Sequence, residues 1–186
     1  MVKFKINDRE LEVEEGTTIL EAALDAGIDI PTLCYHKELT PGGTCRVCLV
    51  EIVGGGRPSL QASCLYKVTE GLEVKTDTER VQRSRKVVLE ILMARCPDAE
   101  PVKKLAAKYG VAETRVELKN QDNCLLCGLC VRACAEISQR KAINFAFRGR
   151  DRSVQTPFHK ISQTCIGCGA CAYLCPTGRI KIEEAD

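Results

Sequence analysis

The chain has 186 residues, enough for one large domain or two small ones, and its formal charge of +2 indicates no particular partner. Hydrophobic residues make up 45% of the sequence, but aromatic residues make up only 4% and Trp is absent. Large aromatic side chains usually dominate core energetics, so we expect metal binding by members of the set of 13 cysteines to help stabilise the fold.

Two features of the sequence predict a cytoplasmic protein with no membrane insertion. Residues 1–8 lack the apolar core of a signal peptide. The longest apolar stretch, residues 87–94, is interrupted by Glu90 and is too short to span a bilayer. In a reducing cytosol, clustered cysteines indicate metal ligands more often than disulfides.

Residues 1–77 have the pattern of a small α+β domain. A capping box of Thr18 and Glu21 predicts the start of one helix, and Gly27 is placed to end it. Alternating polarity and turn residues predict strands around this helix. The predicted strands are residues 2–6, 11–13, 49–53, 60–62 and 72–74, with a hairpin at Gly54-Gly55-Gly56. Strands packed on a single early helix give an α+β fold.

Residues 78–119 are predicted to form a helical connector. A second capping box, which begins at Thr76, predicts a helix that ends at Pro97. Pro101 can occupy the first turn of the next helix, where a backbone N–H would have no partner anyway, and Gly110 ends that helix. The connector would then join two metal-bearing modules.

Residues 120–186 contain one cysteine spacing twice, which indicates a duplicated, pseudo-symmetric unit. The two runs are Cys124-x-x-Cys127-x-x-Cys130-x-x-x-Cys134 and Cys165-x-x-Cys168-x-x-Cys171-x-x-x-Cys175-Pro176. Between them, residues 143–147 alternate in polarity, residues 148–151 form a turn and Val154 begins a return. This pattern predicts a hairpin inserted between the two runs.

The repeated spacing is typical of the ligands of two cubane [4Fe–4S] clusters. Three cysteines of one run wrap three corners of a cube, and in two-cluster ferredoxins the fourth cysteine of each run binds the other cluster. The predicted sets are Cys124, Cys127, Cys130 and Cys175 for one cluster, and Cys165, Cys168, Cys171 and Cys134 for the other. Four-thiolate zinc sites use two Cys-x-x-Cys pairs rather than triplets, and the cytosol disfavours a disulfide framework.

Four further cysteines lie in the first segment with the spacing C-x10-C-x2-C-x15-C: Cys34, Cys45, Cys48 and Cys64. Their close pair and distant fourth member are similar to the plant-type [2Fe–2S] pattern, although the first gap is longer. We expect one [2Fe–2S] cluster here. Zinc stays open as an alternative, because four cysteines are also a legitimate zinc ligand set.

Several stretches resemble a known family of iron–sulfur subunits. They are Pro31-Thr32-Leu33-Cys34-Tyr35-His36, Cys45-Arg46-Val47-Cys48-Leu49-Val50-Glu51, the run from Cys124 to Cys134, Ala142-Ile143-Asn144-Phe145, Arg148-Gly149 and Cys175-Pro176-Thr177-Gly178. The chain resembles the N-terminal region of the large iron–sulfur subunit of respiratory complex I, of iron-only hydrogenases and of the diaphorase subunit of NAD-linked hydrogenases. The resemblance implies a plant-type β-grasp [2Fe–2S] ferredoxin domain, the helical connector and a bacterial-type ferredoxin domain with two [4Fe–4S] clusters.

The region between these domains departs from that family. The family usually has a further [4Fe–4S] cluster there, bound by one His and three Cys, whereas residues 92–100 keep only Cys96 and no His. We therefore expect Cys96 to be a packed thiol rather than a ligand. His36 is expected to form a hydrogen bond within its loop, and His159 is assigned no role.

The sequence has no apparent G-x-G-x-x-G signature, P-loop or catalytic triad, and no further cysteine set for a catalytic hydrogen cluster. We expect an electron-relay subunit without a catalytic site of its own. It would connect a flavin/NAD(P)-binding subunit to the catalytic subunit of a multisubunit hydrogenase. The hydrogenase could be of the electron-bifurcating kind. Three alternatives stay open: the same role in an NAD-linked formate dehydrogenase, a freely diffusing ferredoxin-like carrier and a zinc-bound scaffold.

Charge is uneven along the chain. Residues 10–36 contain seven acids and no Lys or Arg, whereas residues 140–152 contain five basic residues and one acid. These stretches are either solvated faces or docking surfaces for two different partners. Twelve lost thiol protons and about +6 from three cluster cores would bring the formal charge from +2 to about −4, which argues against nucleic acid as a partner.

Overall fold

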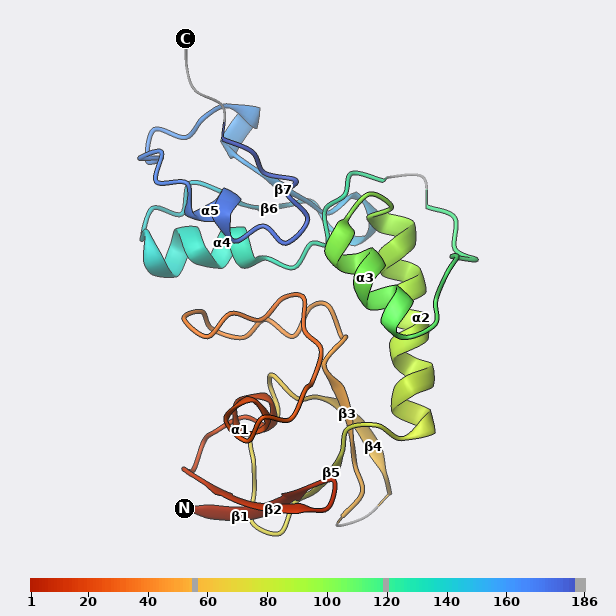
Figure 1. The fold of residues 1–186 in the computed structure, drawn as a ribbon. Helices are drawn as coiled ribbons and strands as arrows, with labels where there is room; N and C mark the ends of the chain where they lie inside the picture. Colours follow the sequence, from red (N-terminus) through yellow and green to blue (C-terminus); the bar gives the residue numbers. More distant parts are fainter. Residues whose placement is uncertain (55–56, 119–120, 183–186) are drawn as a thin grey trace.

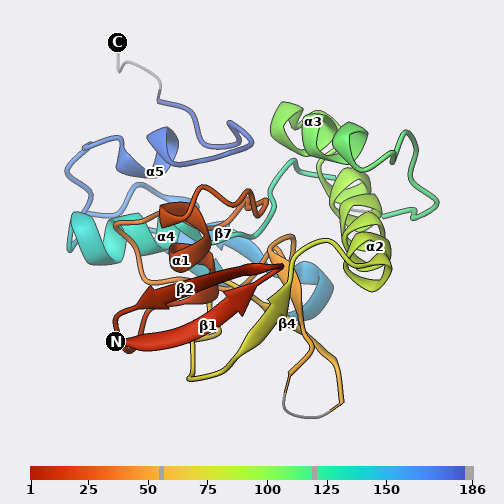
Figure 2. The same ribbon diagram turned by 60° about the horizontal axis from the view of Figure 1, so that its bottom comes forward.

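The computed structural model describes residues 1–54, 57–118 and 121–182. A sheet module lies at the N-terminal end of the molecule and a cysteine-rich module at the other end, with two helices beside them (Figure 1). The long loop that follows the first helix faces the C-terminal module in both ribbon views (Figures 1 and 2).

Five strands form a mixed sheet in the order β2-β1-β5-β3-β4. They are β1 (Val2–Ile6), β2 (Arg9–Val13), β3 (Leu49–Ile52), β4 (Ser59–Ala62) and β5 (Glu73–Lys75). Strands β1 and β5 pair in parallel, and the other neighbouring pairs are antiparallel. The five predicted strands are confirmed. Gly55 and Gly56 of the predicted hairpin lie outside the described residues.

Helix α1 (Ile19–Asp25) packs against this sheet (Figure 2). Its predicted capping box is confirmed: Glu21 N–H donates to the Thr18 hydroxyl at 3.3 Å, and Thr18 N–H donates to the Glu21 carboxylate at 2.8 Å. A first hydrophobic core, which includes Ile6, Leu20 and Val74, fills the space between helix and sheet. The helix and the mixed sheet together form the predicted β-grasp fold.

Two helices follow the sheet module. Helix α2 (Glu79–Arg95) ends before Pro97, and helix α3 (Glu100–Lys108) carries Pro101 in its first turn, both as predicted. Because Pro cannot continue the backbone hydrogen bonding of a helix interior, these two residues separate α2 from α3.

The predicted start of α2 was wrong by two residues. Thr78, not Thr76, is the N-cap, and its hydroxyl accepts a hydrogen bond from Val81 N–H at 3.2 Å. Thr76 N–H donates instead to Asn7 Oδ1 at 3.0 Å. Thr76 directly follows β5, which lies beside β1, and this contact across 69 residues competes with the local cap.

The C-terminal module has little regular structure. Its elements are α4 (Leu129–Arg132), the π-helical turn η1 (Ala133–Ile137), β6 (Asn144–Ala146), the 3-10 turn η2 (Gly149–Asp151), β7 (Ser153–Gln155), the 3-10 turn η3 (Pro157–His159) and α5 (Ala170–Tyr173). Strands β6 and β7 form the predicted hairpin. Gly128 and Gly169 precede α4 and α5 with nearly equal left-handed φ values of 73° and 74°. In both cysteine runs, a short helix therefore begins directly after a left-handed glycine.

A second core lies where the three parts of the chain meet. It draws on the loop before β3, on α2 and α3, and on the first cysteine run; its buried members include Val47, Leu89, Val102 and Leu129. By contrast, none of the described residues 143–182 is buried. Within the described part of the chain, no helix has the length and apolar character needed to cross a bilayer.

Candidate metal centres

The four N-terminal cysteines are all buried and lie in two close pairs. Cys34, Cys45 and Cys48 belong to the loop between α1 and β3, and Cys64 follows β4. Cys45 N–H donates a hydrogen bond to Cys34 Sγ at 3.4 Å, and Cys48 Sγ lies 3.5 Å from Cys64 Sγ. Each residue is at most 4% exposed. The fold thus brings together the four cysteines that the sequence predicts for one site.

Hydrogen bonds within each pair shift the two thiol pKa values in opposite directions. The hydrogen bond from Cys45 lowers the pKa of Cys34 to about 6 and raises the pKa of Cys45 itself. In the same way, the hydrogen bond from Cys64 lowers the pKa of Cys48 to about 6, while the pKa of Cys64 is raised. One thiol in each pair is therefore the more readily ionised of the two. Metals bind the thiolate, so the remaining protons would leave on metal binding.

A second set combines three cysteines of the first run with one of the second. Cys124, Cys127, Cys130 and Cys175 line one cavity of about 80 Å³. Burial raises the pKa of Cys127 to about 11 and the pKa of Cys130 to about 12, and the nearby Cys175 thiol adds to both shifts. This proximity is what crossed ligation between the two runs requires.

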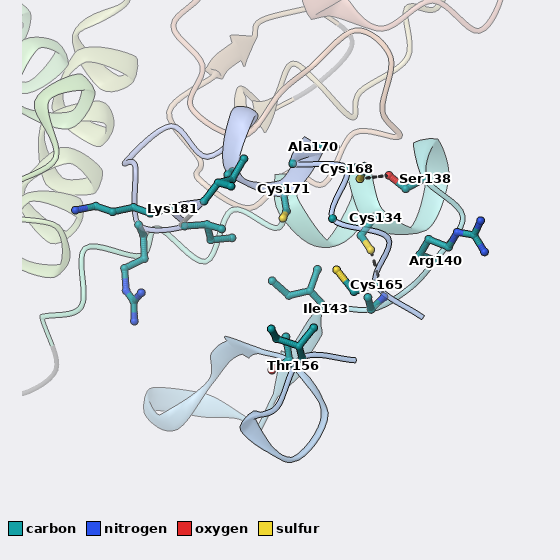
Figure 3. Close-up of a pocket in the computed structure, with 18 of the residues that line it drawn as sticks. Cys134, Ser138, Arg140, Ile143, Thr156, Cys165, Cys168, Ala170, Cys171 and Lys181 are labelled. Atoms are coloured by element: carbon teal, nitrogen blue, oxygen red, sulfur yellow. Dashed lines mark hydrogen bonds between the residues drawn. The ribbon is translucent and has the colours of Figure 1, made fainter. Parts of the chain in front are cut away.

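The third set is more open to solvent. Cys134, Cys165, Cys168 and Cys171 line a hollow of about 1100 Å³, and the labelled sulfur atoms of Cys134, Cys165 and Cys171 face it (Figure 3). Cys165 and Cys168 are exposed. The Ser138 hydroxyl lies 3.2 Å from Cys168 Sγ and lowers the pKa of that thiol. Here too, the fourth cysteine comes from the other run.

The chemistry of these donor sets fits iron–sulfur clusters. Each set offers four thiols, and soft thiolate ligands select such clusters. Ala142 N–H donates to Cys134 Sγ at 3.2 Å, the kind of contact that tunes a cluster's potential. Among the described residues, no three His, Cys, Asp or Glu side chains are placed to hold a single metal ion. A cluster spreads its ligands over separate iron atoms, so the sulfurs need not meet at one point.

Cys96 and the two histidines lie outside these sets. Cys96 is fully buried in the second core, and burial raises the pKa of its thiol to about 12. The predicted packing of Cys96 is therefore confirmed. The predicted hydrogen bond of His36 is also present, because Glu38 N–H donates to His36 Nδ1 at 3.3 Å. His159 is exposed and has a left-handed φ of 57°.

Sequence reasoning gave no role to Arg132, which contacts two of the cysteine sites. Its guanidinium donates to the backbone carbonyls of Cys34 and Cys127 at 2.8 and 3.2 Å. The position of Arg132 between the ligand candidates Cys130 and Cys134 is the signal that could have drawn attention to it.

Two family models match the chain. Residues 1–79 match the 2Fe-2S iron-sulfur cluster binding domain, and residues 123–179 match the 4Fe-4S dicluster domain. The chain therefore contains one region similar to each of these two domain families. Its β-grasp module is the 2Fe-2S domain, and its two cysteine runs lie in the dicluster domain.

The predicted resemblance is confirmed by individual relatives. The chain is 34% identical over 206 residues to a subunit of the NADH-quinone oxidoreductase of Rhizobium meliloti. This alignment covers 97% of the chain and 24% of that protein. It is 31% identical over 216 residues to the NADP-reducing hydrogenase subunit HndD of Solidesulfovibrio fructosivorans, covering 99% of the chain and 36% of that protein. The chain thus spans about a quarter to a third of the length of these relatives.

A solved structure extends the likeness to the fold. A chain in the crystal structure of an NAD+-reducing [NiFe]-hydrogenase in the H2-reduced state matches with a TM-score of 0.83 and 29% sequence identity. The match covers 95% of the present chain and 85% of that chain. The fold of nearly the whole chain therefore has a counterpart in a known protein.

Proposed function

We propose that the chain is an electron-relay subunit that carries one [2Fe–2S] cluster and two [4Fe–4S] clusters. Cys34, Cys45, Cys48 and Cys64 would hold the first; Cys124, Cys127, Cys130 and Cys175 the second; Cys165, Cys168, Cys171 and Cys134 the third. Such clusters, when bound, accept and release one electron at a time. The observation that carries the proposal is that the twelve cysteines lie in three groups of four, one formed by two close pairs and two lining separate cavities.

The chain's own residues would control the environment of each cluster. Burial of the N-terminal set excludes water, whereas the exposed Cys165 and Cys168 would leave the third cluster near the surface. Hydrogen bonds from Ser138 and from Ala142 N–H to sulfur would tune the third cluster's potential. The surface position suits the exchange of electrons with another protein.

We further propose that the chain works in the cytoplasm within a multisubunit, NAD(P)-linked hydrogenase. This proposal includes hydrogenases of the electron-bifurcating kind. Its partners would be a flavin/NAD(P)-binding subunit and a catalytic subunit. Support comes from the relatives, whose names include a NADP-reducing hydrogenase and a NADH-quinone oxidoreductase. The proposed division is a ferredoxin domain at 1–77, a connector at 78–119 and a two-cluster domain at 120–186.

Chemical analysis of anaerobically purified protein tests the clusters directly. We expect about ten iron and ten acid-labile sulfide per chain, the sum for one two-iron and two four-iron clusters. Zinc in place of iron, with no sulfide, would contradict the proposal.

Gentle affinity purification of the native protein tests the proposed partners. Co-purification of flavin and hydrogenase subunits would support the proposed setting. Co-purification of a formate dehydrogenase subunit would show that the catalytic partner is that enzyme instead. A protein that purifies alone as a monomer would indicate a freely diffusing carrier.

A further inference from the structure

The guanidinium of Arg132 connects the loops of two different cysteine sites. Arg132 Nη2 donates to the carbonyl oxygen of Cys34 at 2.8 Å and to that of Cys127 at 3.2 Å. Arg132 Nη1 donates to the carbonyl oxygen of Thr40 at 2.5 Å. Cys34 belongs to the proposed [2Fe–2S] set and Cys127 to the first proposed [4Fe–4S] set. Arg132 thus links the two loops, although it lies 98 positions from Cys34 in the sequence.

The loop around Thr40 is shaped to receive this side chain. A Cβ atom at Gly42 would lie 3.3 Å from both Arg132 Cζ and Nη2, closer than most such contacts. Thr40 N–H donates to the Glu136 carboxylate at 2.8 Å, so a second residue of the same helical segment holds the same loop. The absence of a side chain at Gly42 lets the guanidinium approach the loop backbone closely.

The chemistry of arginine suits this bridging position. Its planar guanidinium offers five donors in a fixed geometry, and hydrogen bonds from a charged donor are stronger than neutral ones. Among the described residues, no carboxylate forms an ion pair with Arg132. The donors on both terminal nitrogens are directed to backbone carbonyls, so the side chain links two backbones rather than neutralising an acid.

We propose that Arg132 is a positioning residue that holds the [2Fe–2S] loop against the first [4Fe–4S] loop and so sets the rate of electron transfer between these two clusters. The inference rests on the proposed function. In the step itself, the reduced [2Fe–2S] cluster loses one electron and the oxidised [4Fe–4S] cluster gains it. No bond breaks and no proton moves, and transfer in the reverse direction depends on the same contact.

Two substitutions separate the effect of the Arg132 hydrogen bonds from the effect of its positive charge. R132Q removes both, whereas R132K keeps the positive charge but lacks the planar fork that reaches three carbonyls. In the iron-loaded protein we expect both variants to slow intramolecular electron transfer after rapid photoreduction by about tenfold, the lower end of the loss that follows removal of groups that orient metal ligands. The EPR interaction between the two reduced clusters should weaken in both. Full rescue by Lys would overturn the proposal, because charge alone would then be sufficient.

Two more variants keep the test decisive. G42A retains Arg132 and every cysteine but pushes the guanidinium away from the loop, so it should slow the transfer in the same direction by a smaller factor. This variant decides the question if R132Q fails to load iron. R115Q is the matched control, because Arg115 forms a surface ion pair with Glu90 at 2.9 Å and should leave the rate unchanged.

The outcomes distinguish this inference from the proposed function. Wild-type protein without iron and sulfide would reject the proposed function itself. Intact clusters with an unchanged transfer rate and unchanged magnetic interaction in R132Q or G42A would reject only the role of Arg132. Slower transfer in R132Q, R132K and G42A, with normal iron content and an unaffected R115Q, supports it.

Discussion

The N-terminal module encloses its four cysteines beside a core of buried side chains, whereas the C-terminal module carries its eight on a scaffold with little core. Cys34, Cys45, Cys48 and Cys64 are each at most 4% exposed. In the C-terminal module, Cys165 and Cys168 are exposed, and no described residue from 143 to 182 is buried. The same donor chemistry therefore has two kinds of support. We therefore expect the first module to fold around its own core and the second to depend on bound clusters for its stability.

Backbone strain follows the same division. Nine described non-glycine residues have positive φ, and seven of them lie in the C-terminal module: Asn123, Leu126, Gln139, Lys141, Phe147, Phe158 and His159. A left-handed conformation costs roughly 1–2 kcal/mol for such residues. Because little apolar surface is buried to offset this cost, we expect the free energy of metal binding to be the main source of stability for this module.

Removal of iron should produce the largest difference between the modules. Anaerobic chelation should abolish amide protection from hydrogen exchange across residues 143–182, because ordering each residue costs about 1–2 kcal/mol of backbone entropy. Strands β1 to β5 should stay protected by their own core. Hydrogen exchange measured by mass spectrometry, with the loaded protein as the control, gives both values in one experiment. Equal loss in the two modules would remove the distinction drawn above.

Single cysteine substitutions should sharpen the comparison within the C-terminal module. If the two runs exchange their fourth ligands, Cys134→Ser should lose the same cluster as Cys171→Ser, with a fall of about four irons in each case. Cys175→Ser should instead match Cys130→Ser. The [2Fe–2S] EPR signal should persist in all four variants, since its ligands lie in the other module. A shared signature for Cys134→Ser and Cys130→Ser would mean that each run closes its own site.

Local signals predicted the fold of the N-terminal module well. The Thr18 capping box, the alternation of residues 2–6 and the two prolines around α3 act within a few residues, so the sequence displays them directly. The false cap at Thr76 shows the limit of such signals. Its polar groups are taken by Asn7, a partner 69 residues away that no local pattern reveals.

Prediction of the sites follows the same rule. The cysteine spacing, together with the crossed ligands of two-cluster ferredoxins, predicts how the twelve candidates are grouped, because ligand geometry restricts the loop lengths between them. The role suggested for Arg132 could not be read from spacing, since its partners Cys34 and Thr40 lie more than 90 residues away. The low burial of residues 143–182 also could not be predicted from the sequence, because their apolar content resembles that of an ordinary domain. In the structure, apolar side chains such as Phe158 and Ile161 are exposed.

A core substitution should affect both modules at once. Leu89 is fully buried in the second core, to which the N-terminal loop and the first cysteine run both contribute. Leu89→Ala should lower the free energy of unfolding of the loaded protein by about 3 kcal/mol, measured by urea titration of the far-UV signal. Ile91 is 46% exposed on the same helix, so Ile91→Ala is a matched control with an expected change below about 0.5 kcal/mol. Similar values for the two variants would show that the second core does not hold the modules together.

Cys96→Ser should have the smallest effect, although Cys96 lies near the first cysteine run. The thiol is fully buried among apolar side chains, and the nearby Cys124 and Cys127 contribute to its raised pKa. A serine hydroxyl placed there without a partner should reduce stability by about 1–2 kcal/mol. Iron and sulfide content should stay unchanged, because each of the three sets already has four thiols. A wild-type content of about fourteen irons that falls to about ten in Cys96→Ser would instead assign Cys96 to a further cluster beside α2, and the second core would then be a metal site.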